Sequence, residues 1–189
     1  IKRFLPKSIL EYVCPVIDGT MRLVDQFLLM RFGNRYRCEI LKKCTEKADA
    51  LFEKAKTNFK VIGDKSSGYM NWRYSDFKGC EYRFFCVTDL KSEELKGVLV
   101  YYRENGVVKI VDCLFGELSR EIEAMLLHFS LEMRKINVDK ISLSFLGEKQ
   151  FHHYLRNTLF LKSLGAEDRF CMLYFDKGYP EKLKHSFLK

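Results

Sequence analysis

The sequence predicts an α+β fold, in which a mixed β-sheet carries helices on both faces and follows an N-terminal helical segment. The first observation is a set of three apolar runs, 82–88, 96–103 and 107–114, with an Asn105-Gly106 hairpin signal between the last two. The second is that strand and helix patterns alternate after this meander. The third is size, because 189 residues with 47% hydrophobic content can enclose one core.

The first part of the chain predicts helices, then a strand, then another helix. Apolar residues within 8–32 follow a helical spacing that Pro15 and Gly19 interrupt, which favours two short helices. Residues 35–41, RYRCEIL, alternate polar and apolar side chains as a half-buried strand does. A further helix is expected from Thr45, a plausible N-cap. Its apolar face consists of Ala48, Leu51, Phe52 and Ala55.

The second part predicts the order β-β-β-α-β-α-β, an antiparallel meander followed by alternating strands and helices. Ser119 is the expected N-cap of a helix whose apolar positions recur at intervals of three and four. A strand follows at 140–146, and the next helix, 148–164, ends at Gly165. Residues 169–175, RFCMLYF, are mostly apolar, which indicates a last strand buried on both faces.

The charge of the chain is positive and uneven. The net charge is +8; residues 1–80 contain 16 Lys and Arg against 9 Asp and Glu, whereas residues 81–189 contain 17 against 16. A positive field of this kind attracts phosphates, such as those of nucleotide cofactors, sugar nucleotides or RNA, without choosing among them. An ordinary solvated lysine-rich face explains the same numbers equally well. Walker, nucleophile-elbow and Rossmann glycine motifs are missing from the sequence, which argues against NTPases and covalent hydrolases.

Seven cysteines without a C-x-x-C pair, mostly beside apolar neighbours, predict reduced and largely buried thiols in a cytoplasmic protein. The four histidines are not spaced with the cysteines as metal ligands would be, so no metal is expected. No apolar run approaches the roughly 18 residues of a membrane helix, so no membrane span is expected.

Three local motifs carry a resemblance to a known superfamily. They are Tyr-x-Asn-Trp-Arg-Tyr at 69–74, KIVDCLF at 109–115 and the helix-closing pair Leu164-Gly165. Together with the order of elements, they resemble the GNAT acyltransferases, and most of all GNAT-like proteins associated with bacterial polysaccharide biosynthesis. The resemblance covers about residues 45–180 of the sequence. It divides the chain into three parts: 1–32, a helical connector; 33–180, a GNAT-like acyltransferase domain; and 181–189, a C-terminal tail.

The resemblance implies transfer of an acyl group from acetyl-CoA, another acyl-CoA or an acyl carrier to an amine or hydroxyl. The acceptor would be a small molecule or sugar, such as a polysaccharide precursor. The family holds the CoA diphosphate on backbone amides where the fourth strand meets the following helix. The matching residues here are Leu114, Gly116, Glu117, Ser119 and Arg120.

The sequence departs from the family pattern at two sites, the diphosphate loop and the proton donor. Cys113 and Leu118 stand where the family's diphosphate loop has Arg or Gln and a small residue. The family's proton-donating tyrosine corresponds to Leu161, so His152 or Tyr154 are the candidates to replace it. A histidine on a helix is nevertheless more often solvated or packed in the core, and His128 is assigned a structural role.

Asp112 is the main catalytic candidate, because it interrupts an apolar strand and would be costly to bury without a partner. It could orient or deprotonate the acceptor, or it could simply pair with Arg73 or Lys109. Trp72 is expected to pack and fix its segment, so that Arg73 points toward Asp112 or a ligand. These two residues and Ser144, which is predicted to line a groove, are the expected substrate contacts.

Two other functions remain open at this point. One is a non-catalytic GNAT-like module that binds a ligand or partner, which the two departures favour. The other is a FemAB-like transferase that uses aminoacyl-tRNA, which the basic first part would suit, whereas DNA is not an expected partner. Longer relatives pair two GNAT-like halves, so residues 1–32 are expected to pack on this domain, on an upstream half, or on a second copy in a homodimer.

Overall fold

The computed structural model describes residues 19–20, 23–24, 26–32, 35–60, 62–77, 79–136, 138–143 and 149–158. One sheet contains five strands in chain order, and the first four are antiparallel while the fifth runs parallel to the fourth. The predicted mixed sheet with its antiparallel meander is therefore confirmed. The predicted strand 169–175 lies outside the described residues. The strands are β1 (Tyr36–Leu41), β2 (Arg83–Asp89), β3 (Leu95–Glu104), β4 (Val107–Phe115) and β5 (Lys140–Leu143).

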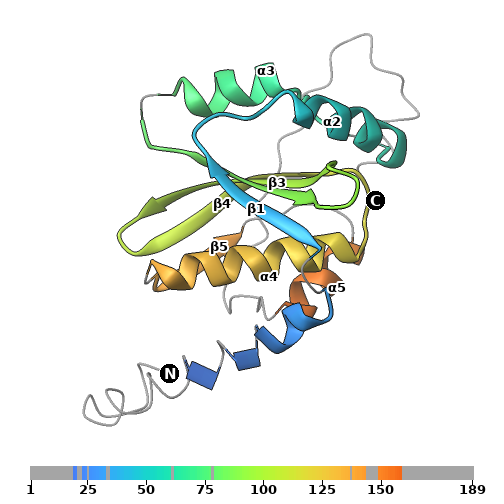
Figure 1. The fold of residues 1–189 in the computed structure, drawn as a ribbon. Coiled ribbons are helices and arrows are strands. Elements are labelled where there is room, and N and C mark those ends of the chain that lie inside the picture. Colours follow the sequence, from blue (N-terminus) through green and yellow to red (C-terminus); the bar gives the residue numbers. More distant parts are fainter. Residues whose placement is uncertain are drawn as a thin grey trace.

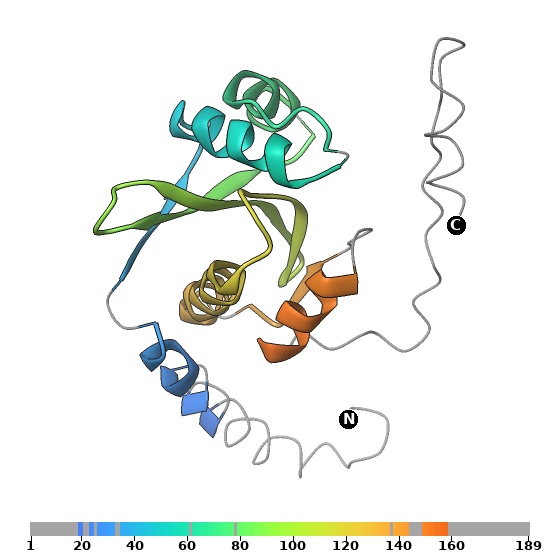
Figure 2. The same cartoon turned by 90° about the vertical axis from the view of Figure 1, so that its right-hand side faces the viewer.

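Helices cover both faces of the sheet, as the sequence predicts (Figure 1). One face carries α2 (Lys47–Asn58) and the short α3 (Ser67–Met70), which continues into the π-helical turn η1 (Asn71–Ser75). The opposite face carries α4 (Arg120–Lys135) and α5 (Lys149–Asn157), and the turned view in Figure 2 separates the two layers. Each layer encloses its own apolar core, called here the α2-side core and the α4-side core.

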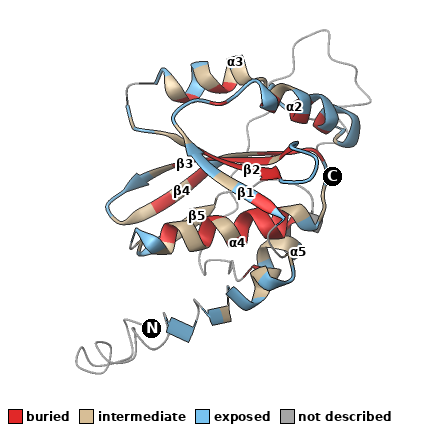
Figure 3. Ribbon diagram, in the orientation of Figure 1, coloured by how far each residue is buried: buried red, intermediate tan, exposed pale blue. Residues whose placement is uncertain are grey.

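The two cores follow from the alternation of strand side chains. In β2, Phe84 and Cys86 point into the α2-side core, while Phe85 and Val87 point into the α4-side core. Burial is therefore concentrated in the sheet and along α4 (Figure 3). The sheet and α4 approach closely at Gly97, where an added Cβ would lie 2.5 Å from the sulfur of a methionine on α4.

The local signals for α4 and for the β3–β4 hairpin are confirmed. Ser119 is the N-cap of α4, and its side chain accepts a hydrogen bond from the backbone N–H of Glu121. The hairpin turns on Asn105 and Gly106, whose φ angles are 48° and 77°. Positive φ at both central residues is what a two-residue hairpin turn needs, and Asn-Gly supplies it at little cost.

A β-bulge interrupts β4 halfway along its length. Val100 of β3 faces Asp112, but the next residue, Tyr101, faces Ile110, so Val111 has no partner on β3. A bulge of this kind reverses the alternation of side chains beyond it. Ile110 accordingly points into the α4-side core, whereas Leu114 points into the α2-side core. Asp112 is carried to the α2 side together with Leu114.

Residues 26–30 form a helix below α4, on the side away from α2 (Figures 1 and 2). The side chain of Phe27 is 70% exposed, so it does not pack on this domain, and its packing on an upstream half or on a second copy stays a prediction. Phe32 does pack against the α4-side core. The division at residue 32 and a contact with a second copy stay predictions.

Candidate functional site

Asp112 is nearly buried on the α2 side of β4, and three hydrogen-bond donors surround its carboxylate. Its carboxylate accepts hydrogen bonds from the Lys65 ammonium group, from the Tyr74 hydroxyl at 2.7 Å and from the backbone N–H of Cys113 at 2.8 Å. Only 13% of the side chain is exposed. The cation that pairs with Asp112 is therefore Lys65 and not Lys109, which bonds Glu104 instead. Pairing does not exclude a role in chemistry, since functional carboxylates also need partners when buried.

The segment that brings Tyr74 to Asp112 is bound firmly to α2 and to the loop before it. Asp49 of α2 accepts hydrogen bonds from the backbone N–H and the hydroxyl of Ser67 at 2.6 and 2.8 Å. The side chain of Asn71 accepts from the N–H of Cys44 at 2.7 Å and donates to its carbonyl at 3.0 Å. These four bonds place α3 and η1 on the sheet as one unit with α2.

Tyr74, rather than Trp72, is the buried aromatic of this segment. Met70 and Tyr74 lie four residues apart and both face the α2-side core. That spacing leaves Trp72 on the outer side of the turn, where it is 67% exposed, so its predicted packing is wrong. Burial, followed by the nearby Asp112 carboxylate, raises the pKa of Tyr74 well above its usual range. Its hydroxyl therefore remains a donor at physiological pH.

Arg73 lies between two tyrosine rings on the exposed side of η1. Its Nη1 donates to the Tyr69 hydroxyl at 2.7 Å, and its guanidinium lies 5.9 Å from the Tyr69 ring and 5.5 Å from the Tyr74 ring. Arg73 does not reach Asp112 directly. Lys65 and Tyr74, the actual side-chain partners of Asp112, were missed because neither a lysine in a loop nor a tyrosine beside Arg73 signals such a contact. The spacing of Met70 and Tyr74 was the one available signal for Tyr74.

The edge of β4 beside Asp112 is unpaired over the described residues. β5 pairs with β4 only from Val107 to Ile110, and its described part ends at Leu143. Across residues 35–60, 62–77 and 79–143 apart from 137, nothing described pairs with 111–115 on that side. Backbone groups on an unpaired strand edge can bind an extended ligand. Asp112 lies within this part of β4, and its own carboxylate accepts a hydrogen bond from the N–H of Cys113.

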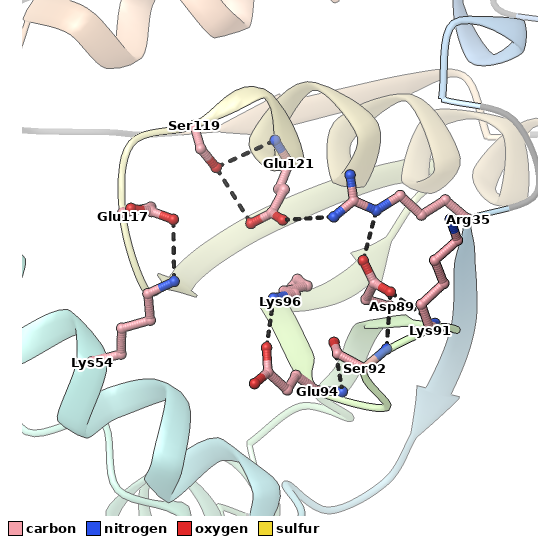
Figure 4. A network of polar contacts seen from close by, with 10 residues as sticks. All are labelled: Arg35, Lys54, Asp89, Lys91, Ser92, Glu94, Lys96, Glu117, Ser119 and Glu121. Atoms are coloured by element: carbon pink, nitrogen blue, oxygen red, sulfur yellow. Dashed lines mark hydrogen bonds and ion pairs between the residues drawn. The ribbon is translucent and has the colours of Figure 1, made fainter.

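The predicted cofactor loop lies where β4 meets α4. Leu114 is buried in the α2-side core, whereas Arg120, the first residue of α4, is exposed. Gly116 is covered by the stem of Lys54 from α2, because an added Cβ would lie 2.8 Å from Lys54 Cδ. The ammonium of Lys54 continues to Glu117, at 3.1 Å (Figure 4). Glu117 therefore forms an exposed ion pair with α2, and its part in holding a cofactor stays a prediction.

A second polar group borders the same end of α4 (Figure 4). Arg35, just before β1, donates from Nε to Asp89 at 2.6 Å and also lies 3.8 Å from Glu121 of α4. The hydrogen bond from Arg35 and that from the backbone N–H of Lys91 lower the pKa of Asp89 to about 2. Ion pairs thus join the start of β1, the β2–β3 turn and the start of α4.

At the β4–α4 connection, the backbone amides suit the diphosphate of an acyl-CoA, whereas one side chain would repel it. Among the described residues, no protein acceptor takes the backbone N–H groups of 117–120. Free amides beside a helix start suit a diphosphate. Glu117 is the opposing side chain, although Lys54 partly balances it. Cys113 adds no cation, and burial raises its pKa to about 12, so it remains a thiol.

The other predicted catalytic residues are not brought to Asp112. Tyr154 of α5 packs against the α4-side core, on the opposite face of the sheet. His152 lies on the same helix, but its side chain is outside the description, and so is the whole of Ser144. Their proposed roles stay predictions. His128 of α4 makes an edge contact with Tyr36 at 6.4 Å, and burial lowers its pKa, which fits a structural role.

A cavity of about 330 Å³ lies elsewhere, between β1, β2 and the start of α2. Its charged lining is balanced, and Asp112 does not line it. Its thiol, Cys86, is unreactive because burial raises its pKa to about 12. The cavity is therefore not the candidate site. Its lining residues are Arg37, Glu39, Leu41, Thr45, Glu46, Lys47, Cys86, Thr88 and Leu95.

The described residues also bear on the expectations for thiols, metal sites and membrane spans. The five described cysteines, 38, 44, 80, 86 and 113, are free thiols that are buried or half-buried, as predicted. Within these described residues, no cluster of three or more His, Cys, Asp or Glu side chains could hold a metal ion. The helices described are all too short or too polar to cross a bilayer.

Comparison with solved structures identifies the fold. A protein described as a probable acetyltransferase superposes with a TM-score of 0.52 at 11% identity, over 74% of this chain and 99% of its own. A point mutant of the protein TTHA1254 from Thermus thermophilus gives 0.46 at 15% identity, over 76% and 99%. An aminoglycoside acetyltransferase from an uncultured soil metagenomic sample, in complex with sisomicin, gives 0.45 at 12% identity, over 76% and 97%.

The chain therefore has the GNAT acetyltransferase fold, as the resemblance predicts. The identity of 11% supports the fold and nothing finer. No protein family model matches the sequence, and no curated protein matches it significantly.

Proposed function

We propose that this protein is an acyltransferase that moves an acyl group from acyl-CoA to an amine or hydroxyl of a small-molecule acceptor. The observation that carries the proposal is the place of Asp112, at a bulge of β4 and beside a strand edge that the described part of β5, which ends at Leu143, does not pair. A carboxylate and backbone groups without a described partner then lie next to each other. A sugar acceptor, such as a polysaccharide precursor, is part of the proposal.

The chain would hold the donor mainly through its backbone. The open edge of β4 at 111–115 would pair with the amide groups of the pantetheine arm, as a strand would. The N–H groups of 117–120 and the exposed Arg120 would hold the diphosphate. Acyl-CoA supplies a thioester whose carbonyl carbon the acceptor attacks directly, with the CoA thiolate as the leaving group.

Asp112 would act on the acceptor. A carboxylate has about four acceptor positions. Lys65 and the Cys113 N–H occupy Oδ1, and Tyr74 occupies one position on Oδ2. The remaining position on Oδ2 can accept a hydrogen bond from the attacking N–H or O–H, which orients its lone pair and draws away its proton. Lys65 and Tyr74 hold the carboxylate in place.

A non-catalytic ligand-binding module is the second candidate, and Glu117 favours it. Its carboxylate stands beside the amides that would bind the diphosphate, where a negative charge weakens anion binding. A FemAB-like transferase has no comparable observation in its favour.

The two candidates differ in whether free CoA is released. The full chain is incubated with acetyl-CoA and with amine-bearing or hydroxyl-bearing sugars, and the CoA thiol is measured with a thiol reagent. We expect release that depends on enzyme and on acceptor. If acetyl-CoA raises the melting temperature but no acceptor in the series yields thiol, the binding module is correct and the acyltransferase proposal fails.

A further inference from the structure

An aromatic surface extends outward from Asp112 along α3 and η1. Trp72 is the only tryptophan of the chain, and its ring lies 5.7 Å from the Tyr69 ring. Phe77, which follows η1, is 54% exposed and lies 6.1 Å from Tyr82. Tyr82 in turn contacts Tyr74 at 5.1 Å. Exposed rings in contact with one another are more informative than a single exposed ring, and they favour a binding surface.

Contacts connect this surface to the candidate site without interruption. Arg73 is bonded to the Tyr69 hydroxyl and lies against the Tyr74 ring. The Tyr74 hydroxyl then donates to Asp112. Arg73 and Tyr74 thus link the surface at Trp72 and Tyr69 to the carboxylate proposed to orient the acceptor. The outer side of η1 is rigid enough for this role, because Asn71 fixes the turn to the loop before α2.

The charges on this surface favour an anionic ligand. Lys65 already neutralises Asp112, which leaves the Arg73 guanidinium in excess. Arg73 uses one N–H for Tyr69, and none of its others has an acceptor among the described residues. Asp76, three residues on, forms no ion pair with it within the described chain. A guanidinium with free N–H groups suits a phosphate or carboxylate.

The same charges oppose a polycationic acceptor. The faces of Tyr69 and Tyr74, where a ligand cation would bind, already hold Arg73 at 5.9 and 5.5 Å. A second cation would be repelled by Arg73 and Lys65. These cations would also lower the pKa of an acceptor amine and favour its neutral form, which is the form that attacks a thioester.

We propose that the surface formed by Tyr69, Trp72 and Arg73 binds the acceptor, and that this acceptor is a sugar bearing a phosphate or carboxylate. The sugar ring packs against Trp72, the anionic group bonds Arg73, and an amine or hydroxyl of the sugar reaches Asp112. The part of this inference that makes the ligand an acyl acceptor rests on the proposed acyltransferase function. The ligand class itself rests only on the surface.

The single tryptophan makes binding directly measurable. Trp72 emission in the full chain is recorded while glucosamine 6-phosphate, glucosamine, an aminoglycoside or adenosine monophosphate is added, with no acyl donor present. We expect a saturable shift of the emission to shorter wavelength with glucosamine 6-phosphate, and binding at least tenfold weaker with glucosamine. Arg73→Met should remove the preference for the phosphate. Arg37→Met, at an exposed arginine on the edge strand β1, is the matched control and should keep it.

Four other results would overturn the inference. Equal affinity for the sugar with and without phosphate removes the role of Arg73, and tighter binding of the aminoglycoside reverses the charge argument. Tighter binding of adenosine monophosphate makes the ligand a nucleotide. A constant Trp72 emission during measurable acyl transfer to a sugar phosphate places the acceptor elsewhere. Saturable binding with no CoA release in the presence of acetyl-CoA would leave the ligand class standing and reject the acyltransferase function.

Discussion

Asp89 is buried and Asp112 is nearly buried, and the two carboxylates lie in different surroundings. Asp89 ends β2, its side chain is 3% exposed, and it bonds Arg35 and the backbone N–H groups of Lys91 and Ser92. Asp112 lies midway along β4, is 13% exposed, and bonds mainly to side chains. Both carboxylates are satisfied, so burial and pairing alone do not distinguish them.

What distinguishes them is what lies next to each. The partners of Asp89 close the β2–β3 turn, whose backbone is itself bonded between Asp89 and Glu94 at 2.9 Å. Asp112 instead lies beside the edge of β4 that no described residue pairs, and it is joined through Tyr74 to an exposed aromatic surface. A functional carboxylate is thus better recognised by the open groups around it than by its own burial.

The largest effect on stability is expected from Asp89→Asn. The amide loses the ion pair with Arg35 and keeps one oxygen for the donors of the turn. We expect a melting temperature several degrees lower, with the rate of transfer per folded molecule unchanged. Circular dichroism on heating measures it, with the exposed Glu53→Gln as control. A loss of transfer at full stability would mean that the two carboxylates have been assigned the wrong roles.

The dependence of this stabilisation on pH follows from the pKa of Asp89, which is lowered from 3.8 to about 2. A lowered folded-state pKa contributes stability that is fully present above the ordinary value and is lost as pH falls through the folded value. The difference in unfolding free energy between wild type and Asp89→Asn should therefore be constant above pH 3.8 and shrink toward pH 2. Urea unfolding at several pH values measures it. If the difference in unfolding free energy persists at pH 2, the destabilisation by Asp89→Asn comes from packing and not from the charge.

Tyr74→Phe tests how firmly Asp112 is held. The ring stays packed, but one hydrogen bond to a buried carboxylate is lost, which should cost about 1–3 kcal/mol. Transfer should fall roughly tenfold, since the carboxylate is less well oriented. Tyr101→Phe is the control, because the Tyr101 ring is buried on the opposite face and its hydroxyl has no hydrogen bond among the described residues. Equal losses in both variants would assign the Tyr74 effect to packing.

The smallest effect is expected at Glu117, which is an exposed carboxylate. Glu117→Gln removes a negative charge beside the amides proposed for the CoA diphosphate. A charge near a helix start is worth about 0.3–1 kcal/mol, so acetyl-CoA should bind about two- to fivefold more tightly at low salt. Calorimetric titration measures the affinity. An unchanged or weaker affinity would place the diphosphate away from this loop.

Local features of the fold could be predicted because their causes lie within a few residues. The Ser119 cap of α4 and the Asn105-Gly106 turn both depend on short-range backbone geometry. The alternation in β2 likewise follows from the strand pattern. The antiparallel meander and the helices on both faces could therefore be predicted before the structure.

The candidate site could be predicted only in part, because its arrangement depends on distant contacts. Asp112 was recognisable as a polar residue in an apolar strand, but the bulge at Val111 that turns it toward α2 has no sequence signal. Its cation, Lys65, comes from a loop 47 residues away. Trp72 was placed in the core by its size, although the spacing of the buried residues beside it leaves it exposed.

The most direct test of the proposed role of Asp112 is the rate of acetyl transfer from acetyl-CoA by Asp112→Asn. The variant keeps the shape of the side chain but loses its charge and one strong acceptor oxygen, and Asp89→Asn, measured at the same concentration of folded protein, is its matched control. We expect a loss of about 100-fold or more for Asp112→Asn and little change for Asp89→Asn. Full transfer by Asp112→Asn, with lowered stability only, would contradict it and make Asp112 a structural ion-pair partner of Lys65.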